Sequence, residues 1–331
     1  MEESLNIRRL IFVAAGATLL CVTAAAFAQS WSPQKNVEIV VGSAPGGSND
    51  KTGRTVEKIL VEKRMLPVTL TVNNKPGGGG NISLTYVSQK VGDAHYLAVA
   101  TPSLLTNHIT GSSPLNYTDF TAVASLFNDY IVFAVNAESS IRTGRDLIER
   151  LKKDPRSLSV GFATTLGSHN HIGAGLLMKA IGGEAKNLKA VAFKGSAEAI
   201  TALLGGHIDL VTTAAGNVDG HVAAGKLRIV GIASAQRFPG ALAVVPTWKE
   251  QGINIVFGGW RAIIGPRGLS AAQSAYWEGA LRKVVETPEW KADLAKNFWS
   301  DDFVTGDQFR KDMAEDYAAM KAVLIDIGLA K

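Results

Sequence analysis

The chain has 331 residues, of which 46% are hydrophobic and 19% charged, and its formal net charge is +5. This composition is typical of a globular α/β protein, and the length favours two domains because single hydrophobic cores stop growing at about 250–300 residues. The mild positive charge suits an acidic ligand, but no cluster of Lys and Arg is dense enough to indicate nucleic-acid binding. Cys21 is the only cysteine, so the chain after it offers no disulfide framework, thiol nucleophile or cysteine metal site.

Residues 1–28 have the pattern of a secretory signal peptide. Arg8 and Arg9 precede an apolar run over residues 10–23, and Ala26-Phe27-Ala28 supplies the small residues of a cleavage site. The run is shorter than the about 20 residues that a membrane-spanning helix needs. We therefore expect residues 1–28 to be removed after export; an uncleaved membrane anchor is the alternative.

The first strand after this segment ends in a glycine-rich turn. Residues 37–41 are mostly β-branched, which predicts a buried strand, and the Pro-Gly-Gly sequence at 45–47 ends it. The polar residues at 48–50 are suitable N-caps for a helix over residues 51–63. A strand, a glycine turn and a helix N-terminus leave free backbone N–H groups at the carboxyl edge of a sheet, where α/β proteins bind anions. We therefore expect this turn to hold a carboxylate.

The elements that follow alternate between strand and helix, which is the signature of parallel sheets. We expect further strands over residues 68–72, 96–100, 131–135, 159–162, 190–193, 208–211, 227–232 and 253–257. We expect helices over residues 83–89, 143–153, 169–178 and 197–204, a short one ending at 225, and three at the end of the chain, from 270, near 288–296 and over 307–326. Because only helices follow the last strands, we expect them to pack onto a sheet that earlier strands form.

A second glycine turn, over residues 73–81, follows the second strand. Because it comes one βα unit after the first turn, the N-termini of two neighbouring helices can share one carboxylate. Each helix N-terminus favours an anion by about 0.3–1 kcal/mol, in addition to its N–H bonds. Tight βα turns without a ligand are the alternative.

Metal and enzyme sites have less support. His169 and His171 stand two residues apart at a helix start, so their side chains point about 200° apart and chelate poorly. Residues 46–52 approach a P-loop, but Asp50 precedes Lys51 where glycine is required, and its carboxylate repels phosphate. The chain has no Gly-x-Ser-x-Gly or His-Glu-x-x-His motif. We expect no catalytic residues, no metal and no cofactor.

The two glycine turns and several later segments together resemble a known family. They are similar, in the order of that family, to the tripartite tricarboxylate transporter solute receptors, the Bug family. The segments are Pro45 to Asp50, Asn74 to Ile82, Phe193 to Ser196, Leu203 to Leu210, Ala224 to Arg228, Val245 to Gly252, and Trp260 to Ala262 ahead of Gly265-Pro266. No single segment is specific, but the ordered set covers nearly the whole chain after the expected signal. Residues 43–45 and 164–171 depart from the family pattern and leave the ligand's identity open.

The resemblance implies a two-lobed periplasmic binding protein with a type II-like α/β fold, in which each lobe is a mostly parallel sheet flanked by helices. It implies lobe one over residues 29–130 and 254–331 and lobe two over 131–253, and the strand and helix series does restart at Ile131. It also implies a small carboxylate in the cleft between the lobes, delivered to a two-subunit membrane permease driven by an ion gradient. Such a receptor is expected to be a periplasmic monomer without enzymatic activity.

The expected ligand contacts come from the loops that face this cleft. Asp50 either caps its helix or meets a donor on the ligand. Lys194 is either a cleft cation or a surface residue, and Arg261 either pairs with an anion or packs near the hinge. The expected ligand-binding residues are Ala44, Gly46, Gly47, Ser48, Asn49, Asp50, Gly78, Gly79, Asn81, Ser103, Thr164, Thr165, Ser168, His169, Gly195 and Ser196.

Two other functions remain open on the sequence. One is a binding module of the same fold that feeds a sensor kinase, which the sequence does not distinguish from a transport receptor. The other is a secreted α/β hydrolase or isomerase. That activity needs a base placed against a nucleophile, and no motif supplies the pair.

Overall fold

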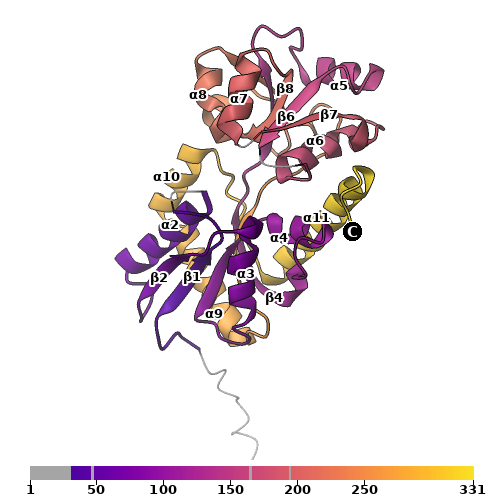
Figure 1. Cartoon of the computed structure of the whole chain (residues 1–331). Coiled ribbons are helices and arrows are strands. Elements are labelled where there is room, and N and C mark those ends of the chain that lie inside the picture. The colour runs from indigo at the N-terminus through magenta and orange to yellow at the C-terminus, as the bar shows by residue number, and fades with distance from the viewer. Residues whose placement is uncertain (1–30, 46–47, 164–165, 194) are drawn as a thin grey trace, which may run out of the picture.

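The computed structural model describes residues 31–45, 48–163, 166–193 and 195–331, so the expected signal peptide at 1–28 lies outside the described residues. The described chain forms two α/β lobes, one above the other in Figure 1. Lobe one is the part built on a six-stranded sheet, and lobe two is the part built on a five-stranded sheet. The two-lobed α/β fold expected from the sequence is confirmed.

The strands follow one another in a different order in space than along the chain. Lobe one has the order β11-β4-β10-β3-β1-β2, and lobe two has the order β7-β6-β8-β5-β9. The strands are β1 (Val37–Val41), β2 (Leu70–Asn74), β3 (Tyr96–Ala100), β4 (Phe120–Phe127), β5 (Ile131–Asn136), β6 (Ser159–Ala163), β7 (Lys189–Phe193), β8 (Leu210–Ala214), β9 (Leu227–Ile232), β10 (Arg261–Pro266) and β11 (Val304–Thr305).

The helices cover the faces of these sheets (Figure 1). The α-helices are α2 (Ser48–Glu62), α3 (Asn81–Ser88), α4 (Ser103–Ile109), α5 (Gly144–Lys153), α6 (His169–Ala180), α7 (Ser196–Leu204), α8 (Asp219–Ala223), α9 (Ala271–Val285), α10 (Pro288–Asn297) and α11 (Gly306–Asp326). Short 3₁₀ helices are η1 (Gly78–Gly80), η2 (Tyr117–Asp119), η3 (Ala185–Asn187), η4 (Ala215–Asn217) and η5 (Gly240–Leu242).

Most strands of each sheet run in one direction. In lobe one, β1 pairs in parallel with β2 and β3, whereas β10 is antiparallel to both β3 and β4. In lobe two, β6 pairs in parallel with β7 and β8, whereas β5 is antiparallel to both β8 and β9. The two reversed central strands, β5 and β10, are the first strands that the chain forms after it crosses from one lobe to the other.

The two crossing segments pair with each other between the lobes. The backbone N–H of Gly259 donates to the carbonyl of Asp129 at 2.9 Å, and the N–H of Asp129 donates back at 3.4 Å. The N–H of Ile131 donates to the carbonyl of Phe257, also at 3.4 Å. This short antiparallel contact fixes Asp129 and Gly259 side by side at the point where the lobes meet.

Strands β10 and β11 were not predicted, so the expectation that only helices follow the last predicted strand is wrong. The strand predicted over residues 253–257 is also wrong, because that stretch lies in no strand. Its side chains do alternate, with Ile255 and Phe257 buried and Val256 exposed. Alternate burial is the pattern of a strand, but this segment has no neighbouring ladder. Strand β4 was missed for the opposite reason, since nearly all its residues are buried and the alternation is absent.

Helix α11 bridges the lobes. On lobe one, the Tyr317 hydroxyl lies 2.9 Å from the ring nitrogen of His108 on α4. On lobe two, the Asp326 carboxylate accepts a hydrogen bond from the backbone of Ala185, and Val323 packs so closely on α6 that a Cβ at Gly175 would lie 2.6 Å from it. Figure 1 shows α11 running from beside α4 toward α6.

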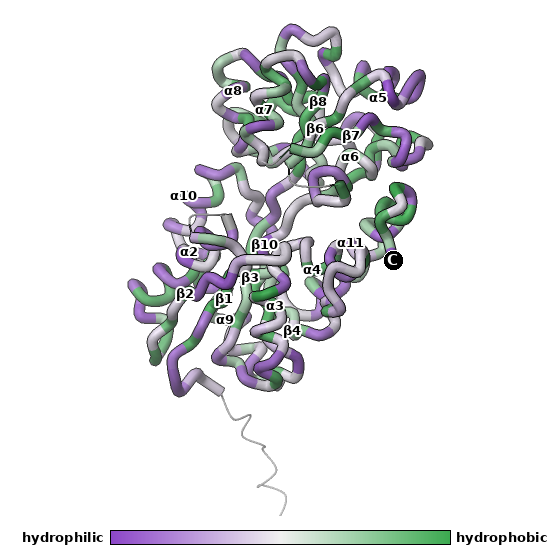
Figure 2. Tube along the Cα trace, viewed as in Figure 1, coloured by the Kyte–Doolittle hydropathy of each residue, from purple (hydrophilic) through white to green (hydrophobic). Residues whose placement is uncertain are grey.

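The apolar side chains gather inside both lobes. Figure 2 shows hydrophobic strands at the centre of each lobe and polar segments on many of the outer helices and loops. One buried cluster extends from the helices of lobe one through α11 to the sheet of lobe two, which joins the two cores. Among the described helices, none combines the length and the apolar character needed to cross a membrane.

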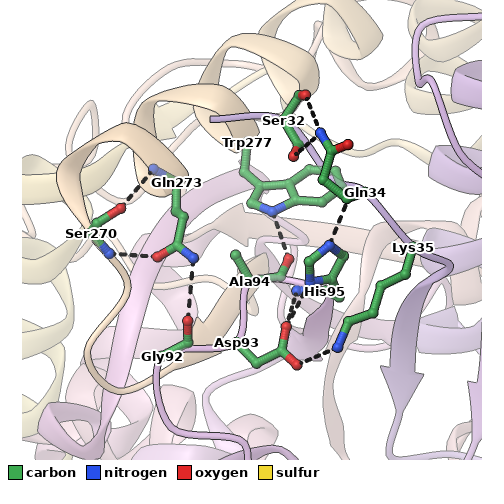
Figure 3. A network of polar contacts seen from close by, with 10 residues as sticks. All are labelled: Ser32, Gln34, Lys35, Gly92, Asp93, Ala94, His95, Ser270, Gln273 and Trp277. Atoms are coloured by element: carbon green, nitrogen blue, oxygen red, sulfur yellow. Dashed lines mark hydrogen bonds and ion pairs between the residues drawn. The ribbon is translucent and has the colours of Figure 1, made fainter. Parts of the chain in front are cut away.

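A network of polar contacts ties the start of the described chain to lobe one (Figure 3). Lys35 Nζ lies 2.9 Å from Asp93 Oδ2, and His95 Nδ1 lies 2.7 Å from Asp93 Oδ1. The buried Trp277 indole of α9 donates to the carbonyl of Ala94 at 2.9 Å. These contacts hold the segment before β1 and the helix α9 against the same loop at residues 93–95.

Candidate functional site

The two glycine turns of lobe one lie against each other at the carboxyl edge of the sheet. β1 and β2 are parallel neighbours, so the turns that follow them emerge at the same edge. A Cβ placed on Gly42 would lie 2.8 Å from the Cα of Gly80 and 2.7 Å from the hydroxyl of Ser83. Only glycine at position 42 permits this approach, so the predicted proximity of the two turns is present.

The second turn requires glycine for a second reason. Gly77, Gly78, Gly79 and Gly80 have φ angles of 125°, 57°, 64° and 96°, which other residues rarely adopt. The side-chain amide of Asn107 on α4 donates to the carbonyl of Gly79 at 3.2 Å. Four glycines and one amide therefore fix the backbone path beside the N-terminus of α3.

Asp50 is linked to the first glycine turn through the side chain of Asn74. The side chain of Asp50 is 4% exposed and accepts hydrogen bonds from Arg54 Nε at 3.0 Å and from Asn74 Nδ2 at 2.8 Å. The same amide of Asn74 donates to the carbonyl of Ser43 at 3.0 Å. This arrangement favours the structural alternative for Asp50, in which its carboxylate fixes the loop.

The loop before α6 forms the facing side of the site in lobe two. Ser168 is the N-cap of α6, and its hydroxyl donates to the carbonyl of Ala163 at 3.1 Å. His171 Nδ1 accepts a hydrogen bond from the backbone of Gly167 at 2.9 Å, and its ring stacks on Phe162. Burial lowers the pKa of His171 to about 4, so this histidine is a neutral support of the loop.

A cavity of about 830 Å³ lies between the lobes. Asn49, Gly79 and Ser103 line it from lobe one, and Ser168 and His169 line it from lobe two. The other lining residues are Thr101, Pro102, Thr106, Asn107, Thr110, Ser112, Leu166, Gly167, Asn170, Gly259, Arg261 and the four residues from Gly328 to Lys331. Among the described residues, no Asp or Glu lines this cavity, whereas the cations of Arg261 and Lys331 do.

A second cavity of about 380 Å³ adjoins the first. The two cavities share a wall made of His169, Asn170, Gly259 and Arg261. Lys51, Asp129, Lys296 and Trp299 are among the residues that line only the smaller one. Arg261 therefore borders both spaces.

Three buried polar atoms in and beside this wall have no hydrogen-bond partner among the described residues. They are Arg261 Nε, Asp129 Oδ1 and His169 Nδ1. The His169 ring stacks on Phe257 with centroids 4.8 Å apart. Burial and the neighbouring Arg261 cation lower the pKa of His169 to about 3, so its ring is neutral near pH 7. Burial raises the pKa of Asp129 to about 6, although Arg261 and a hydrogen bond from Trp299 act to lower it.

The sequence comparison decides the family. Over residues 54–329, the chain matches the model of the TctC family, described as tripartite tricarboxylate transporter family receptor. This chain belongs to the TctC family. The match includes the second glycine turn and β10 but begins after the first turn.

A curated relative aligns with nearly the whole chain. It is described as the UPF0065 protein in the gbd 5' region of Cupriavidus necator, and it is 28% identical over 303 residues. The aligned part covers 90% of this chain and 89% of the relative. The likeness therefore extends over both lobes.

Solved structures share the fold. A TctC solute binding protein from Polaromonas, without ligand, has a TM-score of 0.79 and 28% identity, and the likeness covers 88% of this chain and 99% of that one. R. palustris Rpa4515 with adipate has a TM-score of 0.71 and 24% identity, covering 90% of this chain and 99% of that one. TctC receptors are periplasmic solute-binding proteins, and this chain has their two-lobed fold.

Most of the expected TctC site residues that the structure describes lie in or beside the cavity. Asn49, Gly79, Ser103, Ser168 and His169 line it. The expected contacts that do not line it are Ala44, which is exposed, Gly78 and Asn81 beside Gly79, Asp50 beneath the first turn, and Gly195 and Ser196 at the start of α7. Gly46, Gly47, Thr164, Thr165 and Lys194 lie outside the described residues, and the side chain of Ser48 is likewise not described.

Many residues that line the two cavities were not expected from the sequence, and Asn107, Lys331 and Asp129 are three of them. Asn107 sits on α4, a helix that the sequence pattern did not reveal, and Lys331 follows α11. Asp129 lies in a crossing segment without a motif. Only its backbone pairing with Gly259 brings it to Arg261. Among the described residues, no group of three or more His, Cys, Asp or Glu side chains is arranged to hold a metal ion.

Proposed function

We propose that this TctC-family receptor binds a small carboxylate in the cavity between its lobes. The observation that carries the proposal is the charge of the cavity: Arg261 and Lys331 line it, and no described acidic residue does. The left-handed glycines of the second turn and the N-termini of α3, α4 and α6 add backbone donors for an anion. R. palustris Rpa4515, described with adipate, is a structural neighbour that carries a dicarboxylate.

The receptor acts outside the cytoplasm and hands its ligand to a two-subunit secondary permease. The family description supports the transport role, and the pattern of residues 1–28 supports export. In this scheme lobe one comprises residues 29–130 and 254–331, lobe two comprises residues 131–253, and the protein works as a monomer. We propose no catalytic role for the chain, because the family that it matches is described as a receptor.

A thermal-shift screen tests the ligand class. The purified chain from Gln29 onward is heated with mono-, di- and tricarboxylates and with uncharged sugars as a control. An acid present at 100 times its Kd adds about 2.7 kcal/mol to the free energy of unfolding and raises the melting temperature. If no acid shifts the melting temperature and a sugar does, the carboxylate assignment fails.

Export is tested separately. The full chain is expressed in a bacterium with a periplasm, the periplasmic fraction is collected, and the N-terminus of the protein is sequenced. We expect it to begin near Gln29. Retention of the intact N-terminus in the membrane fraction would favour an uncleaved anchor instead.

A further inference from the structure

The wall between the two cavities holds a partly buried cation, Arg261, that has no ion-pair partner among the described residues. We propose that Arg261 binds a second anionic group of the ligand, and that Asp129 takes up a proton when this group binds. This inference rests on the proposed function, because it concerns the same cleft and adds the class of ligand, a dicarboxylate, and the residue that selects it.

Arg261 is held in place by backbone and left short of partners. Its Nη1 donates to the carbonyls of Gly259 at 2.7 Å and Trp260 at 3.4 Å, whereas its Nε has no partner. None of the ion pairs within 4.0 Å among the described residues involves Arg261. Arg261 is partly buried. Its guanidinium stays charged, and its buried Nε needs either a counterion or a further acceptor. A ligand carboxylate supplies both.

Gly259 makes room for this charge. A Cβ at Gly259 would lie 3.2 Å from Arg261 Nη1 and 3.0 Å from His169 Nε2. The guanidinium of Arg261 and the imidazole of His169 therefore both lie against the backbone of Gly259. They come from different lobes, since Arg261 begins β10 of lobe one and His169 begins α6 of lobe two. A group bound at Arg261 contacts the hinge and both lobes at once, which is the placement expected of a group that senses closure.

Asp129 interacts electrostatically with Arg261: the cation acts to lower the pKa of Asp129, and the carboxylate acts to raise the pKa of Arg261. The Oδ1 of Asp129 is buried without a partner. When a ligand carboxylate reaches Arg261, it repels the charge on Asp129 and takes over the favourable interaction with the cation. Both changes favour the protonated form of Asp129. Binding of the second carboxylate therefore takes up a proton.

The other charged groups around the pair leave Asp129 as the residue that titrates near neutral pH. Its pKa of about 6 lies closest to that range, and the pKa of His169 is held at about 3. The remaining charged groups at the cavity walls are lysines. They are Lys51 on α2, which is paired with Asp293 at 3.0 Å, Lys296 on α10 and Lys331 after α11.

Isothermal titration calorimetry on matched acids tests the selectivity. The dicarboxylates succinate, glutarate, adipate and pimelate are compared with the monocarboxylates butyrate, valerate, hexanoate and heptanoate. We expect the best dicarboxylate to bind the unaltered protein about 10- to 100-fold more tightly than the monocarboxylate of equal length. Arg261→Gln removes most of this difference, Arg261→Lys restores part of it, and Arg237→Gln, which removes a surface arginine paired with Glu250, leaves it unchanged.

The proton is counted by repeating the titration in phosphate and in Tris, which differ in ionisation enthalpy. We expect the unaltered protein to take up a fraction of a proton with the dicarboxylate, and its affinity to fall as the pH rises from 6 to 8. Asp129→Asn abolishes the uptake, whereas Asp93→Asn, which removes a carboxylate that lines neither cavity, retains it. Circular dichroism and melting temperature establish that each variant is folded.

The outcomes separate this inference from the proposed function. If acids bind but Arg261→Gln weakens monocarboxylates and dicarboxylates equally, or not at all, the selectivity assigned to Arg261 is overturned and the receptor role stands. If dicarboxylates are selected but no proton is taken up, the role of Asp129 is overturned. If no acid binds, the proposed function fails and this inference fails with it.

Discussion

Two polar clusters of this protein differ in whether their buried polar atoms have hydrogen-bond partners. In the network beside β1, Lys35, Asp93, His95 and Trp277 all have hydrogen-bond or ion-pair partners (Figure 3). In and beside the wall between the two cavities, Arg261, Asp129 and His169 each carry a buried atom without a hydrogen-bond partner. Buried polar groups in folded proteins are normally paired, so exceptions need an explanation. The first cluster therefore holds the fold, and in our proposal the second is completed by a ligand.

Asp93 in the first cluster and Asp129 in the second have pKa values that are shifted in opposite directions. Burial raises the pKa of Asp93, but hydrogen bonds from Lys35 and His95 outweigh it and bring the pKa to about 2. Burial raises the pKa of Asp129 to about 6, and Arg261 and Trp299 compensate only in part. The folded protein therefore favours the charged form of one aspartate and disfavours that of the other. Five substitutions, in four experiments, test this contrast.

The largest expected effect is on the packing of the first cluster. Trp277 is fully buried, and its indole donates to Ala94. Trp277→Ala removes the ring and leaves the carbonyl without its donor, so we expect the free energy of unfolding to fall by about 3–5 kcal/mol. Urea denaturation measures the loss. A carboxylate affinity that falls more than about tenfold in the folded variant would show that the two clusters are coupled.

The next effect is the pH dependence of Asp129→Asn. Because the folded pKa of Asp129, about 6, lies above the reference value of 3.8, ionisation of this group destabilises the fold, and stability is lost as the pH rises from 4 through 6. The unaltered protein should lose about 2.5 kcal/mol relative to Asp129→Asn between pH 4 and pH 8. Denaturation curves at both pH values measure this. A constant difference would mean that Asp129 titrates normally.

A smaller effect is expected from a matched pair of glycines. Gly79 and Gly182 have φ angles of 64° and 86°, so alanine at either position costs about 1–2 kcal/mol in backbone strain. Only Gly79 lines the cavity, where a Cβ would lie 3.3 Å from the amide of Asn107. We expect both variants to melt earlier and only Gly79→Ala to bind carboxylates more weakly. Equal affinities would place the ligand away from the second turn.

The smallest effect is that of Asp93→Asn. The folded pKa of Asp93, about 2, lies below the reference value of 3.8, so its stabilising contribution is present above pH 4 and is lost as the pH falls to 2. Since Lys35 is mostly exposed, the contribution should be below about 1 kcal/mol. Urea denaturation of both proteins at pH 5 and pH 2.5 measures it. A variant that loses stability equally at both values would assign the effect to packing.

The sequence predicted elements with a clear period best. The helix expected over 307–326 is α11, and the strand expected over 227–232 is β9. Small, uniformly buried residues hid β4, and alternate burial without a neighbouring ladder mimicked a strand at 253–257. Local patterns report the environment of side chains, whereas strand pairing depends on distant parts of the chain.

The same limit applies to the site. The glycine turns and Ser168 were expected because their chemistry is visible in neighbouring residues. Arg261 was recognised only as an open alternative, and Asp129 was not recognised at all, because their proximity arises from the pairing of two crossing segments. A sequence window contains only one of these segments, so it does not reveal the charge that the other brings.

The most direct test is a crystal structure of the protein with the dicarboxylate that binds it most tightly. One carboxylate should accept hydrogen bonds at about 3 Å from backbone N–H groups near Gly79, and the other should lie at a similar distance from Arg261. Density for the acid outside the cavity between the lobes, or a second carboxylate directed away from Arg261, would contradict the account.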